Sequence, residues 1–77
     1  MIGLSVGEIV YTTTGSQFSF GKCVSALQDG RYKIQSIHYV RNRDGSVSPD
    51  KDDVLPHTFL VGKRGEHMRL RYKRYLG

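Results

Sequence analysis

The 77-residue chain has no tryptophan and a single cysteine, Cys23. One cysteine excludes an internal disulfide framework, and a small chain without disulfides is typical of a reducing compartment. The chain also lacks an apolar run of about 18 residues, which a membrane-spanning helix needs. Its N-terminus has neither the basic nor the apolar region of a secretion signal. These absences predict a cytoplasmic protein without a membrane partner.

Residue patterns that carry catalysis or bind metals are missing as well. No histidine or cysteine lies at metal-ligand spacing from another, and no glycine-rich phosphate loop or nucleophile motif is present. The acidic run over residues 50–53 lacks the spaced ligands and the closing glutamate of a calcium loop. A chain of this length forms one small domain with no room for a deep catalytic pocket. We therefore expect a protein that is not an enzyme and holds no metal or cofactor.

Basic charge, in contrast, is abundant and unevenly placed. The chain carries 12 lysines and arginines against 7 acidic residues, which gives a net charge of +5. Residues 1–60 hold six basic and six acidic side chains, whereas residues 61–77 hold six basic side chains and one acid, Glu66. The whole excess of positive charge therefore lies in a basic C-terminal segment, residues 61–77.

A β-hairpin is predicted in the stretch from residue 18 to residue 40. Two runs rich in β-branched and aromatic residues flank Asp29-Gly30 there, and Asp-Gly between such runs favours a tight turn because glycine adopts positive φ at little cost. An isolated hairpin is barely stable in water, so further strands must pack with it. The expected strands cover residues 8–14, 18–27, 31–40 and 57–61. Gly21, inside the second strand, predicts a bend or bulge.

Two segments outside these strands have less regular patterns. Residues 41–53 contain Asp44-Gly45, a proline and several acids but almost nothing to bury, and we expect an exposed loop there. Residues 66–76 fit either a strand or a helix, since the apolar positions alternate at Met68, Leu70 and Tyr72 but also follow one helical face at Met68, Tyr72, Tyr75 and Leu76. We favour the helix, because an acid near its start and bases near its end suit the helix dipole.

Several short strands with a bent second strand indicate a small all-β barrel, a single domain over residues 1–77. Three segments carry a family resemblance: VGEIVY at residues 6–11, FGKCV at residues 20–24 and DGRYKI at residues 29–34. Together, over roughly residues 6–35, they resemble the first three strands of SH3-like barrels of the Tudor, agenet and KOW type. The residue pattern predicts four or five strands, and the resemblance implies that they form an SH3-like barrel, to which the C-terminal helix would be added.

The basic C-terminal segment favours a contact with DNA or RNA. Clustered lysines and arginines neutralise phosphates and release counterions, and interleaved tyrosines can stack on unpaired bases. The residues predicted to bind nucleic acid are Lys22, Arg31, Lys33, Lys63, Arg64, Arg69, Arg71, Tyr72, Lys73, Arg74 and Tyr75. Two other interpretations remain open: the charges only solvate the surface, or they contact an acidic protein.

A second functional hypothesis comes from the strand aromatics. The resemblance to Tudor-like domains implies an aromatic cage that binds a methylated protein partner by cation–π attraction, with Tyr11, Phe18, Tyr32 and Tyr39 as its candidates. The competing interpretation is that these rings pack in the core. A protein-interaction module, either a peptide reader or an accessory subunit, would use these aromatics and the 41–53 loop. Exposed sheet edges also allow two copies to pair as a homodimer.

Overall fold

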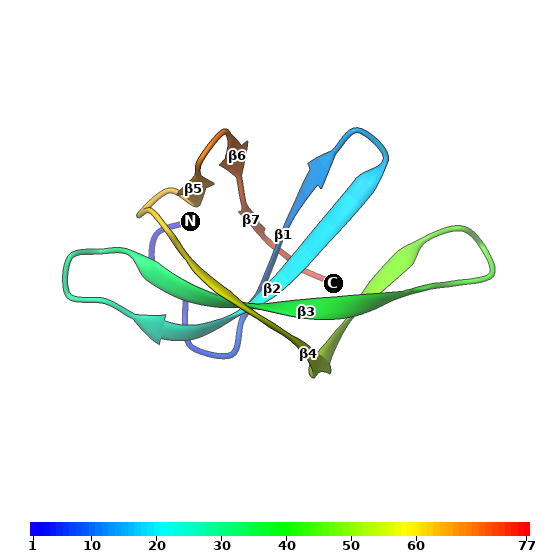
Figure 1. The fold of residues 1–77 in the computed structure, drawn as a ribbon, viewed down its shortest axis with the longest axis horizontal. Coiled ribbons are helices and arrows are strands. Elements are labelled where there is room, and N and C mark those ends of the chain that lie inside the picture. The colour runs from blue at the N-terminus through cyan, green and yellow to red at the C-terminus, as the bar shows by residue number, and fades with distance from the viewer.

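The computed structural model describes all 77 residues and contains seven strands and no helix (Figure 1). The prediction of an all-β fold is therefore confirmed. In chain order the strands are β1 (Ile9–Thr14), β2 (Gln17–Ala26), β3 (Tyr32–Arg41), β4 (Val47–Val61), β5 (Glu66–His67), β6 (Leu70–Arg71) and β7 (Lys73–Arg74). No helix that could cross a membrane is found.

Five strands form one antiparallel sheet in the order β4-β3-β2-β1-β7, and β5 pairs with β6 in a separate hairpin. This hairpin lies between the two ends of the main sheet. Gly62 at the end of β4 donates a backbone hydrogen bond of 2.8 Å to the Glu66 carbonyl on β5, and the Thr12 hydroxyl on β1 donates one of 2.9 Å to the Arg71 carbonyl on β6. The arrangement is consistent with a small SH3-like barrel, although β4 and β7 do not pair and the barrel does not close.

The main core lies on one face of the sheet. Val10, Cys23 and Ile34 project from β1, β2 and β3 with at most 1% of their surface exposed. Leu4 from the N-terminal segment and Tyr72 from the C-terminal segment cover them. Gly21 on β2 passes so close to the Ile34 side chain that a Cβ atom would collide with it, so the glycine permits this packing. The expected bulge lies slightly later, where the β2–β3 register shifts between Cys23 and Ser25.

The helix favoured over residues 66–76 is wrong. This segment contains β5, β6 and β7. Tyr72, which both patterns share, is only 6% exposed and reaches the core, whereas Met68 and Leu76 of the supposed apolar helical face are about nine-tenths exposed. Met68 also adopts a φ of 55° in the turn between β5 and β6, a conformation that a helix does not contain. Backbone groups here are paired between β5 and β6 and between β7 and β1, while an isolated helix this short is marginal in water.

The exposed loop predicted for residues 41–53 is shorter than expected, because residues 47–53 belong to β4. The turn covers residues 42–46 and is closed by a 2.8 Å hydrogen bond from the Asn42 N–H to the Ser46 carbonyl. Val47 pairs with Arg41 and Asp50 with His38 on β3. In this stretch residues 47–50 are half-buried and residues 51–53 are exposed, without alternation along the strand. Main-chain pairing therefore holds it without the apolar alternation that marks a strand with one buried face.

The main sheet splits into two arms beyond its centre. The pairing of β2 with β3 ends at Phe20 and Ile37, and from there the β1–β2 hairpin and the β3–β4 hairpin diverge (Figure 1). The C-terminus lies between the two arms in this view. The β3–β4 arm extends along the long axis of a molecule that measures 41 × 25 × 23 Å.

Two irregularities bend β4 across the sheet. The β3–β4 register shifts between Gln35 and Ile37 and again between Ile37 and His38, which leaves short stretches of β4 without ladder partners. Side chains of β2 and β3 donate hydrogen bonds to three of the carbonyl groups in these stretches. The Lys22 ammonium donates to the Lys51 carbonyl at 3.0 Å, and the Gln35 amide donates to the carbonyls of Leu55 and His57.

Candidate nucleic-acid interface

Most of the basic side chains have no acidic partner. Only two of the twelve form ion pairs within 4 Å: Arg31 with Asp29 at 2.7 Å, and Arg74 with Glu8 at 3.0 Å. The net positive charge is therefore not neutralised within the molecule, and its effect depends on where the unpaired cations lie.

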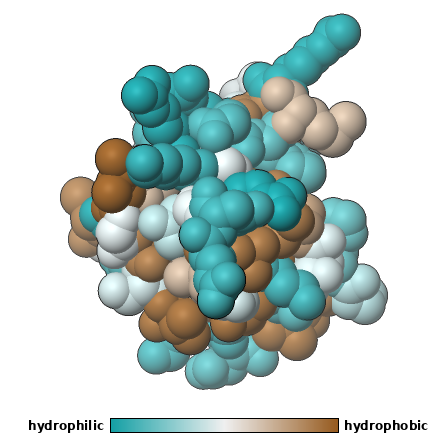
Figure 2. Space-filling model, turned by 90° about the vertical axis from the view of Figure 1, so that its left-hand side faces the viewer, coloured by the Kyte–Doolittle hydropathy of each residue, from teal (hydrophilic) through white to brown (hydrophobic).

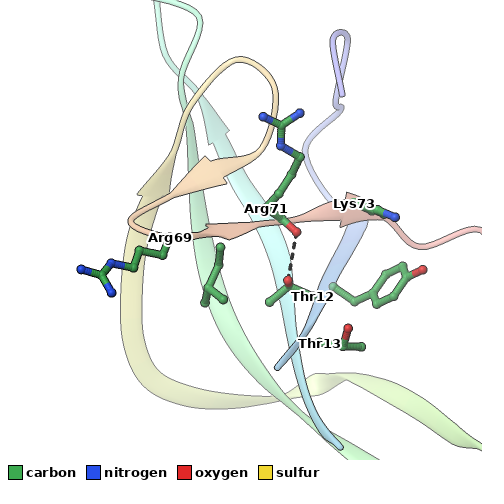
Figure 3. A pocket seen from close by; sticks show the side chains of 7 residues that line it. Thr12, Thr13, Arg69, Arg71 and Lys73 are labelled. Atoms are coloured by element: carbon green, nitrogen blue, oxygen red, sulfur yellow. Dashed lines mark hydrogen bonds between the residues drawn. The ribbon is translucent and has the colours of Figure 1, made fainter. Parts of the chain in front are cut away.

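Three of these unpaired cations lie beside the free edge of β1, and we call Arg69, Arg71 and Lys73 the basic edge. They line a depression of about 350 Å³ whose other walls are Tyr11, Thr12, Thr13 and Leu70 (Figure 3). The depression contains no carboxylate. It forms because β7 pairs with β1 only at Val10 and Tyr11, so that β1 continues past the end of β7 without a main-chain partner on this side.

The three basic side chains extend in different directions from the chain between β5 and β7 (Figure 3). They do not converge on a single point, as the ligands of a small bound anion would. The Thr12 hydroxyl is already used in its bond to the Arg71 carbonyl, whereas Thr13 is exposed and its side chain has no hydrogen-bond partner in the protein. This geometry suits successive groups along an extended polyanion.

The remaining predicted cations are distributed elsewhere. Lys63 and Arg64 lie in the turn between β4 and β5, and the Lys63 side chain packs beside Gly30 in the β2–β3 turn. Figure 2 views the molecule from the end that carries these turns and shows hydrophilic side chains separating several hydrophobic patches. Lys33 is exposed on β3, while Lys22 is held by its bond to Lys51. The structure thus brings together only part of the predicted basic set.

Aromatic rings gather on the opposite face from the main core, where the two arms diverge. Phe20 is only 4% exposed and lies at their centre. Its ring centroid is 5.6 to 6.1 Å from those of the four surrounding rings, which are Tyr11, Phe18, Tyr39 and Tyr75. Tyr11 and Phe20 are direct cross-strand partners, and such partners project from the same face of a sheet.

A cavity of about 430 Å³ opens beside these rings, and we call it the aromatic cleft. Its lining residues are Tyr11, Phe18, Phe20, Ser46, Val47, Arg74, Tyr75 and Leu76. They come from both arms and from the C-terminal end of the chain. The Arg74 side chain is bound on the protein side, because its guanidinium pairs with Glu8 and approaches the Ile2 carbonyl at 3.4 Å. The ion pair is not an aligned hydrogen bond, since the Arg74 Nε has no hydrogen-bond partner.

The predicted aromatic cage is only partly assembled. Tyr11, Phe18 and Tyr39 lie around Phe20, but Tyr32 belongs to the main core and its hydroxyl accepts a 3.2 Å hydrogen bond from the Gly3 N–H. Tyr72, predicted to stack on bases, is also buried, with its ring centroid 5.2 Å from that of Phe59. Burial raises the pKa of the Tyr72 hydroxyl above its ordinary value.

Several lining residues carry little or no signal in the sequence. Phe20 is not among the predicted site residues, although it alternates with Phe18 and its register with Tyr11 follows from the short turn between the first two strands. Val47 lies within residues 41–53, for which the sequence predicts an exposed loop. Nothing in the sequence distinguishes Thr13 from the neighbouring threonines. It lines the depression only because β7 stops pairing with β1 at Tyr11.

The basic edge and the aromatic cleft adjoin each other at Tyr11, which lines both. Lys73 is the cross-strand partner of Tyr11, so that its side chain projects from the same face of the sheet as the ring. The sole thiol, Cys23, lies apart from both and is buried, which raises its pKa. Comparison with models of known protein families, with curated proteins and with solved structures found no match.

Proposed function

We propose that this protein binds nucleic acid without catalysis, mainly through phosphate contacts made by the basic edge. The observation that carries the proposal is the placement of Arg69, Arg71 and Lys73 around one depression that contains no carboxylate. Cations without internal partners can neutralise phosphates and release the counterions that surround a nucleic acid. The exposed Thr13 hydroxyl can add a hydrogen bond to a phosphate oxygen.

Contacts of this kind position a nucleic acid without reading its sequence. The basic edge offers no bidentate arrangement aimed at a base edge, because its side chains diverge. We therefore expect weak sequence preference and a strong dependence of affinity on salt. We also expect the protein to act in a reducing compartment such as the cytoplasm, where its buried free thiol remains reduced.

The test is a titration of labelled single-stranded DNA, RNA and duplex DNA, followed by fluorescence anisotropy at several salt concentrations. Three phosphate contacts predict a log–log slope of affinity against salt of about −2 for single strands. A variant with Arg69→Ala, Arg71→Ala and Lys73→Ala should lose most of the affinity and most of this slope.

A control variant changes the net charge by the same amount at positions outside the predicted set. It carries Arg41→Ala, Arg43→Ala and Lys51→Ala, all exposed residues of the β3–β4 hairpin. This control should retain most of the binding. Equal losses in both variants would show that the basic edge is not the binding surface, and binding that does not change with salt would refute the phosphate mechanism.

A peptide-binding module is the second candidate, and two observations support it. Residues 6–35 resemble Tudor-like and KOW-like barrels, and three of the four cage candidates lie together around Phe20. However, Tyr39 does not line the aromatic cleft, and no carboxylate in the cleft wall is available to favour a methylated cation. Binding of a methyllysine peptide that persists at high salt and is lost in Tyr39→Ala would favour this candidate.

A further inference from the structure

The aromatic cleft presents apolar ring surface that no other part of the chain covers. Tyr11, Phe18 and Tyr75 are each only partly buried, although they pack against a buried Phe20. The cleft stays open because the two arms separate beyond the last β2–β3 pair, Phe20 with Ile37. Its volume of about 430 Å³ falls within the range of about 300–1,000 Å³ that is usual for small-ligand pockets.

The cleft is close to neutral, whereas the neighbouring basic edge is not. Arg74 is the one charged residue that lines the cleft, and Glu8 pairs with it at 3.0 Å. The basic edge carries three cations without acidic partners. The two adjoining surfaces therefore suit different chemical groups, a flat neutral ring in the cleft and an anion at the edge.

These two groups occur together in one nucleotide of a single strand. Lys73 projects beside Tyr11, so that a phosphate bound to its ammonium lies next to the ring that begins the cleft. In a duplex the bases are paired and stacked on one another, and their faces are not accessible to side chains. An unpaired base offers a free face, on which aromatic side chains stack whatever the sequence.

We propose that the aromatic cleft takes an unpaired base, and that the nucleic acid bound at the basic edge is therefore single-stranded. This inference rests on the proposed function. It adds to that function a second contact surface and a choice of ligand, neither of which follows from phosphate binding alone.

The decisive experiment compares three ligands of equal length: a single-stranded oligonucleotide, the same backbone without bases, and a duplex. Binding is measured by anisotropy at low salt. The single strand should bind about tenfold more tightly than the abasic strand, which is the loss that one missing stacking contact causes. It should also quench the tyrosine emission of this tryptophan-free chain, whereas the abasic strand should not.

Two variants locate the base without disturbing the core. Leu76→Asp places a carboxylate at the cleft rim on a side chain that is 89% exposed, and Val6→Asp makes the same charge change on the N-terminal segment, at 65% exposure. The ratio of the affinity for the single strand to the affinity for the abasic strand, about ten in the wild-type protein, should fall close to one in Leu76→Asp. Val6→Asp should weaken both ligands equally and leave that preference intact.

The outcomes separate the two proposals. Equal affinity for the single strand and the abasic strand, with a steep salt dependence, would overturn the base-binding inference and leave the phosphate mechanism standing. A duplex that binds more tightly than the single strand would also overturn it. The absence of binding to all three ligands would overturn both.

Discussion

The two faces of the main sheet both carry apolar and aromatic side chains, but only one of them is fully covered. On the first face, Val10 and Ile34 are completely buried beneath Leu4 and Tyr72, which come from the two ends of the chain. On the second face, Phe20 and Ile37 are buried, but Tyr11 and Phe18 remain partly exposed beside an open cleft. The same strands supply both faces, because successive side chains alternate between them.

The comparison shows how a 77-residue domain divides its few large side chains. Small domains bury a modest fraction of their surface and depend on a compact core. Here the chain ends complete that core on one side, and the divergence of the hairpins prevents the same closure on the other. We infer that the first face supplies most of the stability and that the second supplies a contact surface. Substitutions on the two faces should therefore have different effects.

The largest effect on stability is expected from Ile34→Ala in the main core. Ile34 has no exposed surface, and the substitution should lower the free energy of unfolding by about 2–5 kcal/mol through lost transfer energy and the cavity left behind. Urea denaturation measures the change. Ile34→Val, expected to cost about 1 kcal/mol, provides a milder version if the alanine variant does not fold. A loss below 1 kcal/mol for Ile34→Ala would contradict the assignment of this face as the stabilising one.

Phe18→Ala in the aromatic cleft should have a smaller effect on stability and a larger one on binding. Because the ring is only partly buried, its removal should cost about 1 kcal/mol. Affinity for a single-stranded oligonucleotide should fall about tenfold. Denaturation and anisotropy on the same sample check both values. If Phe18→Ala destabilises as strongly as Ile34→Ala, the second face is a core and the contrast between the faces disappears.

Tyr72→Phe tests the covered face through its dependence on pH. Burial raises the pKa of Tyr72, so the folded state keeps the hydroxyl protonated at a pH where the unfolded chain has begun to ionise. The stability due to the neutral side chain is fully present below the unfolded pKa of about 10, and it is lost as pH rises through the folded pKa. Urea denaturation at pH 9 and pH 11 should show a smaller alkaline loss in Tyr72→Phe than in the wild-type protein. Identical losses would indicate that Tyr72 is accessible to water.

The smallest effect is expected at Asp44, in the turn at the tip of the β3–β4 hairpin. Hydrogen bonds from the Ser46 hydroxyl at 2.6 Å and the Ser46 N–H at 3.0 Å lower the pKa of this exposed carboxyl. The ionised Asp44 carboxylate therefore contributes to the stability of the folded protein at pH values above its unfolded pKa. This contribution is lost as the pH falls through the lower pKa of the folded state. Between pH 6 and pH 3 the free energy of unfolding should fall slightly less in Asp44→Asn than in the wild-type protein, as measured by urea denaturation. The packing of the covered face should not change. A large change would mean that the arm is coupled to the core.

The parts of the fold that were predicted correctly rest on local signals. The first three strands were placed within about one residue, because their β-branched and aromatic runs end at turns such as Asp29-Gly30, where Gly30 adopts a φ of 92°. Residues 47–53 were misassigned because a two-stranded arm exposed to water needs no apolar pattern. Residues 66–76 were misassigned because their strands are two residues long and are stabilised by distant partners, among them Thr12 and Val10.

The candidate site was also predicted only in part, because the sequence shows which residue types are present but not which distant residues they contact. Net charge identified the C-terminal segment, but it did not indicate that Arg74 is paired with Glu8, some 66 positions earlier in the chain, while Arg69 and Arg71 are not. Composition identified the aromatic residues without separating Tyr32, which packs in the core, from Phe18, which borders the cleft. Such distinctions follow from strand register and from the point where pairing stops.

The unpaired outer edge of β4 affects whether copies of this protein associate with one another. A strand of 15 residues with an unpaired side is ordinarily a template on which other chains assemble into aggregates. Here two prolines withhold amide protons, four charged side chains between residues 50 and 53 repel neighbours, and the irregular register prevents a straight approach. The free end of β1 is flanked by like charges instead. Concentrated solutions should therefore stay monodisperse until an added polyanion removes that repulsion.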